Sequence, residues 1–589
     1  MKKKYVRWTL WTIASPFILF VILCILIYLP PIQNFLVDKA AVYASEATGM
    51  NISVGRISLS FPLNLVVTDV DAASPHNDTL LSVRRLQVNV QLLPLLKKQV
   101  EVDGISLQGA TVNSNDLIHG MKLNGTLGEL FISSHGVALD PETAIVNKVL
   151  LKDTDLSLCL NDTAAVDTAA SDTTYWKIIL QDIDLQNVSF ALDMPLDSLS
   201  LAASLDNAIL RDGLIDLHKS AYSLQTFRIK NGRVRYDSGK PLAADSLPSG
   251  LDPSHIALTD IGVKLDSLYY EGRNMKAIIS QFVLKERSGV EIVSATGRMV
   301  SNDKVLRVPS LKLETRDSYL ELNAAMDWNA LDFKGEGLVS ARLMADIGKP
   351  DVVRFMGRMD EKFVRQYPSE PLRIRTGIDG DLNKLKLTTL TAELPGALGL
   401  FARGELTHLT DSLLRGGDIT LEAETKDLKF VSTLAEGIEI PYGTRLEGKF
   451  TMAGTKMGTD LLLMQPEAQA VVAADTIPIT VYNDSISVAD DFKMERAARL
   501  FAKYDLSRDR YEADLAVNHF DLHQFMPADS LYTLSTRLKV EGEGFDFFSP
   551  RTYFNAEGGI DRFHYGSYHL TGISLAVGLE KSKVHASLL

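Results

Sequence analysis

Residues 57–68, ISLSFPLNLVVT, decide how this chain folds. Every odd-numbered position from Ile57 to Val67 is apolar, and the even-numbered positions are polar apart from Pro62 and Val66. Successive side chains of a β-strand point to opposite faces, so this alternation predicts a strand with one apolar and one polar face. Pro62 cannot donate a hydrogen bond to a neighbouring strand, which indicates an edge or a bulge at that point.

The same alternation extends on both sides of this stretch. Upstream, Ile52 and Val54 occupy even positions, so the phase slips at Gly55-Arg56 and predicts a β-bulge. Further alternating segments occur at residues 86–92, 100–107, 320–328 and 573–579. Turns rich in Gly, Asn, Asp and Ser separate such segments, so the sequence predicts a mainly β protein.

Helical patterns are few. Residues 351–367 lie between Pro350 and Pro368 and carry a helical stripe of apolar residues, which predicts a helix packed on the sheet. Residues 491–503 predict a second short helix. Residues 161–174, NDTAAVDTAASDTT, are polar and low in complexity and predict a loop or insert.

Residues 8–29 contain no charged side chain and, as a helix, would be roughly 33 Å long, enough to cross a bilayer. The run ends in residues 28–31, YLPP, a poor cleavage site for the alternative of a secretory signal peptide. We therefore expect an uncleaved transmembrane anchor over residues 8–30. The residues expected to form the anchor are Trp8, Trp11, Phe17, Phe20, Leu23, Leu26 and Tyr28.

Basic residues precede this span. Lys2, Lys3, Lys4 and Arg7 favour a cytoplasmic N-terminus, which would leave the bulk of the chain on the far side of the membrane. The expected segments are a cytoplasmic tail (1–7), the anchor (8–30), a linker helix (31–49), and β regions at 50–115, 116–345 and 346–589. Residues 583–589 alternate as though a strand had begun, so we expect the chain to be part of a longer protein.

Composition excludes several classes of function. The net charge is −13 and the main basic cluster is the N-terminal tail, so we expect no nucleic-acid partner. The two cysteines, Cys24 and Cys159, provide neither a disulfide framework nor a zinc site.

The chain shows no motif for catalysis or nucleotide binding. His519 and His523 are four residues apart, a spacing that on a helix would suit a metal, but we expect a strand end and a short turn there. The sequence therefore predicts no metal, no cofactor and no enzyme, although an anchored enzyme that lacks a known motif is an alternative.

Residues 48–114 carry a family resemblance. Thr48-Gly49 precedes the first strand, and V-G-x-I-x-L follows at residues 54–59 with a D-V element at 69–70. Residues 79–90 then read T-L-L-x-V-x-x-L-x-V-x-V, and residues 95–107 read L-L-x-x-x-V-x-V-x-x-I-x-L. This combination resembles the N-terminal region of the AsmA-like superfamily, which includes TamB-like subunits of the translocation and assembly module.

The resemblance implies a long curved antiparallel β-sheet that rolls into a taco-like groove. Such proteins are anchored in the inner membrane of diderm bacteria by one N-terminal span, with the bulk in the periplasm. The implied function is phospholipid transport between the inner and outer membranes along the apolar groove. The alternative is a scaffold that assists outer-membrane protein assembly by docking a barrel partner through strand addition at an open edge.

The resemblance brings no catalytic residues. The residues expected to line the groove are Ile57, Leu59, Phe61, Leu63, Leu65, Val67, Leu86, Val88, Val90 and Leu92. A competing interpretation places these residues in an ordinary closed core.

Overall fold

The structure is a computed structural model. The described residues are 39, 42, 45, 50–60, 64–74, 79–91, 102–114, 120–138, 142–161, 175–239, 250–333, 337–357, 359–435, 437–465, 496–546, 548–581 and 583–588. Within them the chain is mainly β with few short helices, as the sequence predicts. The chain divides into two units, residues 1–302 and 303–589.

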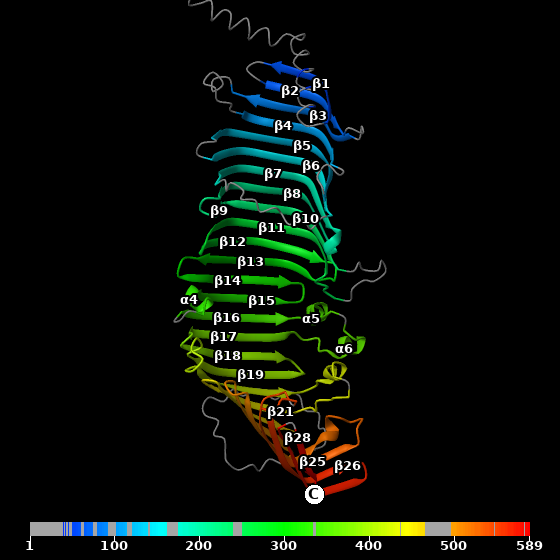
Figure 1. The fold of residues 1–589 in the computed structure, drawn as a ribbon, viewed down its shortest axis with the longest axis vertical. Helices are drawn as coiled ribbons and strands as arrows, with labels where there is room; N and C mark the ends of the chain where they lie inside the picture. Colours follow the sequence, from blue (N-terminus) through cyan, green and yellow to red (C-terminus); the bar gives the residue numbers. More distant parts are fainter. Residues whose placement is uncertain are drawn as a thin grey trace, which may run out of the picture. The chain divides into compact units, whose positions relative to one another are not determined.

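The strands of the first unit follow one another across a sheet (Figure 1). They are β1 (Asn51–Ser60), β2 (Asn64–Ala73), β3 (Thr79–Val90), β4 (Val102–Asn113), β5 (Met121–Ala138), β6 (Thr143–Leu160), β7 (Lys177–Met194), β8 (Leu199–Asp216), β9 (Ala221–Leu224), β10 (Thr226–Ser238), β11 (His255–Glu271), β12 (Asn274–Glu286) and β13 (Glu291–Ser301). The short β9 and the longer β10 both lie between β8 and β11.

The stretch that predicts one strand over residues 57–68 is instead the hairpin of β1 and β2. β1 ends at Ser60 and β2 begins at Asn64, and Leu59 lies opposite Leu65. The odd-numbered apolar residues continue across the turn because paired residues of antiparallel strands point to the same face. The single apolar face was therefore predicted correctly, and the single strand was not.

One pair of strands departs from the expected antiparallel arrangement. β6 and β7 are parallel, with Thr143 opposite Lys177, whereas the other pairs described in this unit are antiparallel. A parallel pair requires a connection that returns the chain to the edge where the first strand began. The connection between β6 and β7 contains the polar insert that the sequence places at 161–174.

A single row of residues bends strands β1–β8 and β10 of the first unit. At this row, which we call the crease row, the pairing skips one residue in each strand and then resumes in register. It contains Gly55, Asp69, Arg84, Gly109, Gly128, Asp153, Asn187, Asp206 and Asn231. The skipped residue in each of these strands explains the phase slip at Gly55-Arg56. Because β1 and β2 each skip one residue there, this feature is not the predicted β-bulge.

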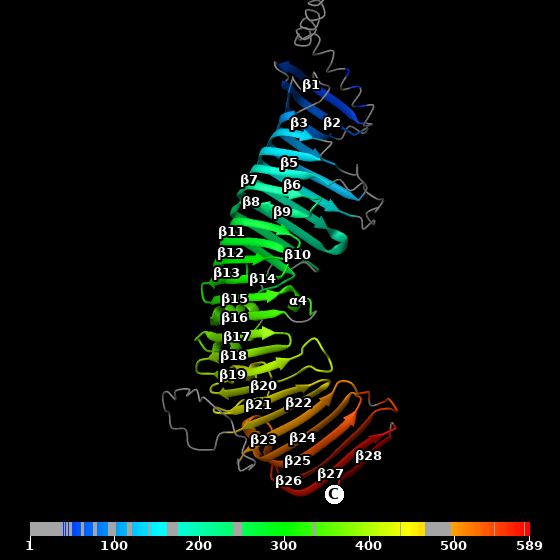
Figure 2. The same ribbon diagram turned by 90° about the vertical axis from the view of Figure 1, so that its left-hand side faces the viewer.

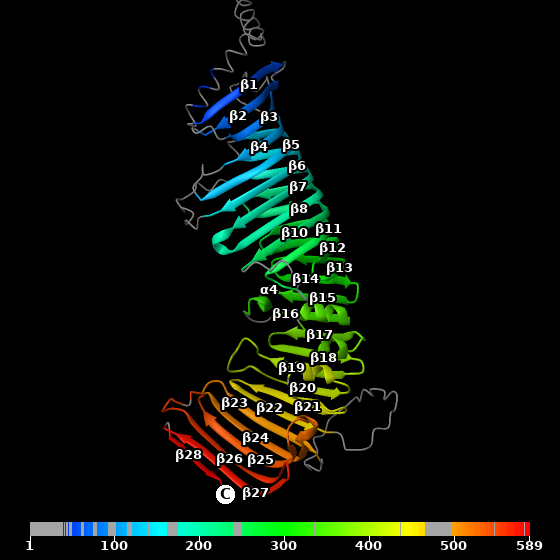
Figure 3. The same ribbon diagram turned by 90° about the vertical axis from the view of Figure 1, so that its right-hand side faces the viewer.

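The crease row is crowded, and its backbone is unusual. Asp69, Asp153 and Asn187 have φ of 54°, 49° and 51°, a conformation that Asn and Asp tolerate better than most residues. A Cβ atom on Gly128 would lie 2.7 Å from Cβ of Asp153, so glycine is required there. Figures 1 and 3 show that the strands of this unit curve along their length.

The apolar face lies on the inside of this bend at β10. A Cβ atom on Gly232 would lie 3.2 Å from Cγ2 of Ile229, three residues earlier and on the other side of Asn231. The two halves of the strand therefore lean toward each other on the face that carries Ile229.

The second unit is an antiparallel array in which each strand pairs with the next (Figure 2). Its strands are β14 (Val305–Thr315), β15 (Tyr319–Asp327), β16 (Leu338–Ile347), β17 (Leu372–Asp381), β18 (Lys384–Leu394), β19 (Leu398–Thr407), β20 (Gly416–Thr425), β21 (Arg445–Ala453), β22 (Lys456–Met464), β23 (Ala497–Asp505), β24 (Arg510–Asp521), β25 (Leu531–Glu543), β26 (Tyr553–Tyr565), β27 (Tyr568–Glu580) and β28 (Lys583–Leu588).

Short helices occupy connections between strands. The α-helices are α4 (Trp328–Leu331), α5 (Lys349–Met356) and α6 (Glu361–Gln366), and the 3-10 helices are η1 (Pro195–Asp197), η2 (Lys429–Thr433) and η3 (Leu522–Gln524). The helix predicted over 351–367 is present as α5 and α6, which are separated at Gly357, where φ is 77°. We call strands β14–β28 the second sheet and strands β1–β13 the first sheet. In Figure 1, α4 lies at one edge of the second sheet and α5 and α6 lie at the other.

The prediction of a helix over 491–503 is wrong for the residues that the structure describes, because residues 497–505 form the strand β23. Its Ala, Arg, Leu and Lys residues favour helix in isolation. However, Leu500 and Ala502 pair with β22 and β24 on the apolar face, and this tertiary pairing decides the conformation.

The expected N-terminal segments lie mostly outside the described residues. Lys39, Val42 and Ser45 of the predicted linker helix are helical. Among the described residues, no helix is both long and apolar enough to cross a bilayer. The predicted tail and anchor, residues 1–30, are not among them.

Candidate functional site: two apolar sheet faces

The predicted groove residues of β1, β2 and β3 lie on one face of the first sheet. Leu59 lies opposite Leu65, which lies opposite Val88, and the neighbouring set is Ile57, Val67 and Leu86. Val90 follows Val88 on the same face of β3. The other three predicted residues, Phe61, Leu63 and Leu92, lie outside the described residues.

The pairing extends this face across the first unit on both sides of the crease row. One row contains Leu59, Leu65, Val88, Ile105, Ile132, Val149, Ile183, Leu210, Phe227, Leu265 and Ile279. The row across the crease contains Val54, Val70, Val83, Ala110, Leu127, Thr154, Val188, Leu205, Gly232 and Ile261. Neither row contains a charged residue.

The second unit also carries apolar rows without a charged residue, and they cross every strand from β14 to β28. Its central row contains Leu311, Leu322, Leu343, Thr376, Leu390, Ala402, Leu421, Gly448, Leu461, Leu500, Leu515, Leu538, Gly558, Leu575 and Leu588. At about 4.8 Å between strands, this row extends for roughly 65 Å along the sheet.

A second row runs parallel to the central row, closer to one edge of the sheet, and we call it the rim row. It contains Leu306, Met326, Val339, Gly380, Leu385, Leu406, Gly417, Met452, Met457, Tyr504, Tyr511, Gly542, Phe554, Leu579 and Val584. It is aliphatic at first and becomes rich in methionine and aromatic residues from β21 onward.

The opposite face of the second sheet carries the charged residues. Arg499 makes two hydrogen bonds to the carboxylate of Asp460, at 2.8 and 2.6 Å. Further cross-strand ion pairs are Lys312–Glu321, Arg375–Asp346, Arg373–Glu393, Lys384–Glu405, Arg445–Glu424 and Lys539–Glu512. The hydrogen bond from Arg499 lowers the pKa of Asp460, which keeps this carboxylate ionised.

The apolar faces are not the inside of a closed core in the described residues. Leu59, Val88, Leu515 and Leu538 are all only half-buried, whereas large side chains in a closed core are almost fully buried. The small Ala402 is buried among larger neighbours. Most of the apolar rows thus lie on partly exposed sheet faces, whereas Val83, Val339 and Leu579 within them are buried.

Closed packing occurs instead at the edges of the second sheet. Phe363 of α6 is 1% exposed, and its ring centroid lies 5.6 Å from Phe430 and 5.5 Å from Tyr367. A smaller cluster joins Ala330 of α4 to Val339. The helices therefore cover the ends of strands and leave the central row accessible.

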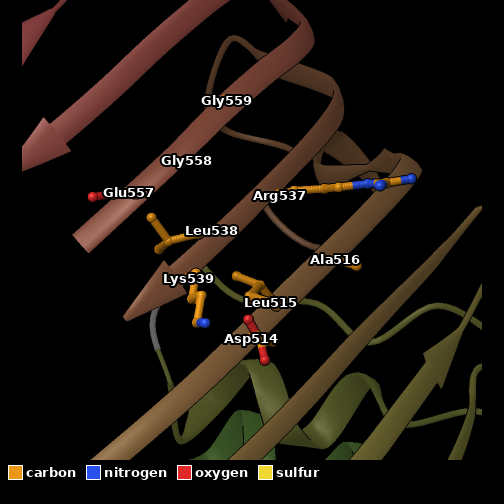
Figure 4. A pocket seen from close by; sticks show the side chains of 9 residues that line it. All are labelled: Asp514, Leu515, Ala516, Arg537, Leu538, Lys539, Glu557, Gly558 and Gly559. Atoms are coloured by element: carbon orange, nitrogen blue, oxygen red, sulfur yellow. The ribbon is translucent and has the colours of Figure 1, made fainter. Parts of the chain in front are cut away.

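An open hollow of about 390 Å³ lies over β24, β25 and β26. Leu515 and Leu538 lie side by side in it, and Arg537 points away from them (Figure 4). Gly558 follows Leu538 in the central row, where an added Cβ would lie 3.0 Å from Cδ1 of Leu538. Two leucines of the central row thus line the hollow.

Aromatic rings close one side of the face beside this hollow. Tyr504 and Tyr511 are paired in the rim row, and the ring of Phe545 stacks on Tyr511 with centroids 5.0 Å apart. The ring of Tyr511 lies over Gly542, where an added Cβ would be 2.5 Å from its Cζ atom. Burial raises the pKa of the Tyr511 hydroxyl, which therefore stays protonated.

The described residues contain no cluster of three or more His, Cys, Asp and Glu side chains that could hold a metal ion. The strand end and turn predicted at His519 and His523 are confirmed, because β24 ends at Asp521 and η3 follows. The ring centroid of His523 lies 4.8 Å from that of Tyr532, and among the described residues no third ligand group joins the two histidines.

Comparison with protein-family models and with characterised proteins found no match to this chain. The resemblance of residues 48–114 to the AsmA-like superfamily therefore stays a prediction.

Proposed function

We propose that this protein carries the acyl chains of phospholipids along its apolar sheet faces and acts in outer-membrane biogenesis from an inner-membrane anchor. One observation carries the proposal: the central row crosses every strand from β14 to β28 without a charged residue, and most of its side chains are partly exposed. A large exposed apolar surface is costly in water unless it has a ligand or partner.

The apolar faces of the two units suit the acyl chains of an amphiphilic ligand. Each CH2 group transferred from water to the apolar face would gain about 0.8 kcal/mol. The head group would stay in water at the edge of the sheet, because the rows offer it no ionic partner. Movement along a row of equivalent leucines needs no chemical step, so the proposal requires neither catalysis nor a cofactor.

A phospholipid with a photoreactive diazirine in its acyl chain tests this proposal. The full chain, purified in nanodiscs, is equilibrated with this lipid, irradiated and digested, and the adducts are mapped by mass spectrometry. We expect adducts on Leu59, Leu515 or Leu538 and their neighbours in the apolar rows. Adducts confined to residues 8–30, or spread equally over the charged face that carries Arg499, would overturn the proposal.

A further inference from the structure

The rim of the second sheet carries large apolar side chains that point into solvent. Four successive hairpins turn at this rim, and we call their described residues 408–415, 454–455, 506–509, 544–546 and 548–552 the rim loops. The exposed fractions of their large apolar residues are 76% for Leu413, 63% for Leu414, 46% for Leu506, 59% for Phe545 and 93% for Phe548.

Backbone hydrogen bonds join the rim loops into one continuous border. The amide of Gly454 donates to the carbonyl of Arg415, at 2.6 Å, and the amide of Leu506 donates to Thr455, at 2.9 Å. The amide of Gly544 donates to the carbonyl of Asp509, at 3.0 Å. Because hairpins at one edge recur every second strand, neighbouring loops are spaced by about 9–10 Å.

The border is continuous with the apolar face. The ring of Phe545 stacks on Tyr511 and lies 6.0 Å from the ring of Tyr504, and both tyrosines belong to the rim row.

The acidic groups of the rim loops are engaged within the loops themselves. The carboxylate of Asp411 accepts hydrogen bonds from the amides of Leu413 and Leu414, and that of Asp546 accepts one from Phe548. The carboxylate of Asp509 accepts the hydroxyl of Tyr504. The acidic groups thus hold the turns.

By contrast, the guanidinium groups of Arg508 and Arg551 in the rim loops, and of Arg510 at the adjoining start of β24, make no ion pair in the described part of the chain. All three residues are exposed. Arginine binds phosphate through two parallel hydrogen bonds.

We propose that the rim loops insert into the surface of a phospholipid bilayer that contains anionic lipid. Large apolar side chains on three separate loops, with arginines nearby that make no ion pair among the described residues, suit a fluid interface that solvates each loop independently. The contact would place the aromatic end of the rim row against the lipid. Exchange of acyl chains between the bilayer and the apolar face rests on the proposed function. The contact of the rim loops with the bilayer does not.

Fluorescence quenching in the full chain tests the contact. An environment-sensitive fluorophore is attached at Phe548→Cys in a Cys24→Ala, Cys159→Ala background, and the chain is held in nanodiscs. The matched control carries the fluorophore at Ser369→Cys, an exposed position in the turn between α6 and β17. Vesicles that contain doxyl-labelled lipid are then added, with phosphatidylcholine alone or mixed with phosphatidylglycerol.

We expect blue-shifted emission and quenching at position 548, several-fold stronger with phosphatidylglycerol, and neither at position 369. The variant Arg508→Gln, Arg510→Gln, Arg551→Gln should lose this dependence on anionic lipid. Equal quenching at the two positions in both vesicles would overturn the contact, and equal quenching at position 548 with and without anionic lipid would overturn the role of the arginines. Acyl-chain adducts on the central row, measured on the same samples, report separately on the proposed function.

Discussion

Asn187 donates a hydrogen bond from its side-chain amide to Oδ1 of Asp153, 2.9 Å away, across the parallel pair of β6 and β7. Both residues have positive φ, and both belong to the crease row. The side chain of Asn231 likewise donates to Asp206 two strands further on. Residues that permit the left-handed backbone thus also join neighbouring strands by side-chain hydrogen bonds.

Replacing Asn187 by valine should destabilise the first unit by about 2 kcal/mol or more, because a β-branched residue tolerates positive φ poorly. Asn187→Gly is the matched control: it loses the same hydrogen bond but adopts this φ without strain, so it should cost less. Urea midpoints and hydrogen exchange of β6 and β7 measure the difference. Equal losses in the two variants would mean that the hydrogen bond matters and the backbone conformation does not.

The sequence predicts the faces of this protein better than its connections. Alternation at 57–67 identifies the apolar face, because burial of one face imposes a period of two on the residues. The phase slip at Gly55-Arg56 identifies one position of the crease row. The rest of the row is not evident from any one strand, because Asp153 and Asn187 look like ordinary turn residues until pairing aligns them.

The parallel pairing of β6 with β7 and the strand β23 could not be predicted from the local sequence pattern. Nothing in β6 or β7 distinguishes a parallel partner from an antiparallel one. In β23, good helix formers hide an alternating pattern whose apolar side becomes clear only through the register with β22 and β24. The rim loops were not predicted either, since exposed Leu413 and Phe548 lie in turns without any period.

A charge in the central row should block lipid without unfolding the sheet. Leu538→Glu places a carboxylate on the half-buried apolar face, where it can remain hydrated. We expect near-normal circular dichroism and an approximately tenfold drop in acyl-chain adducts, equivalent to about 1.4 kcal/mol. Lys539→Glu, the next residue on the opposite face, should leave the adducts unchanged. Global unfolding of Leu538→Glu would instead indicate a closed core.

Gly542 and Tyr511 should be energetically coupled. An added Cβ at residue 542 would meet the ring of Tyr511, so Gly542→Val should displace the ring and destabilise the second unit by about 1–3 kcal/mol. Tyr511→Ser removes the obstacle, and Gly542→Val should then cost much less. A double-mutant cycle from urea midpoints measures this coupling, and additive effects would show that the ring does not lie over the glycine.

The ion pair of Arg499 and Asp460 predicts a small dependence of stability on pH. The pKa of Asp460 is lower in the folded chain than in the unfolded chain, so the pair stabilises the fold above the unfolded pKa and is lost as pH falls through the folded pKa. Because about a third of each side chain is exposed, Asp460→Asn should cost at most about 1 kcal/mol near neutral pH.

This cost should shrink as the pH falls below 3.8, the ordinary pKa of an aspartate side chain, and urea titrations at several pH values would measure it. The control is Asp514→Asn, at an exposed carboxylate that makes no ion pair among the described residues. A cost for Asp460→Asn that stays constant in acid would contradict the assignment.

The cluster of Phe363, Tyr367 and Phe430 under α6, which we call the edge core, should lose its packing without unfolding the apolar face. Phe363→Ala removes a ring that packs against Tyr367 and Phe430, and a buried Phe→Ala change typically costs about 3–5 kcal/mol. Leu434→Ala, at an exposed position at the same edge, should cost little. Hydrogen exchange should accelerate in α6 and η2 while the central strands β22–β25 stay protected, because those strands are held by their own ladders and not by this cluster. If protection were lost across β22–β25 as well, the edge core would be part of the same cooperative unit as the apolar face, and the face would depend on a closed core after all.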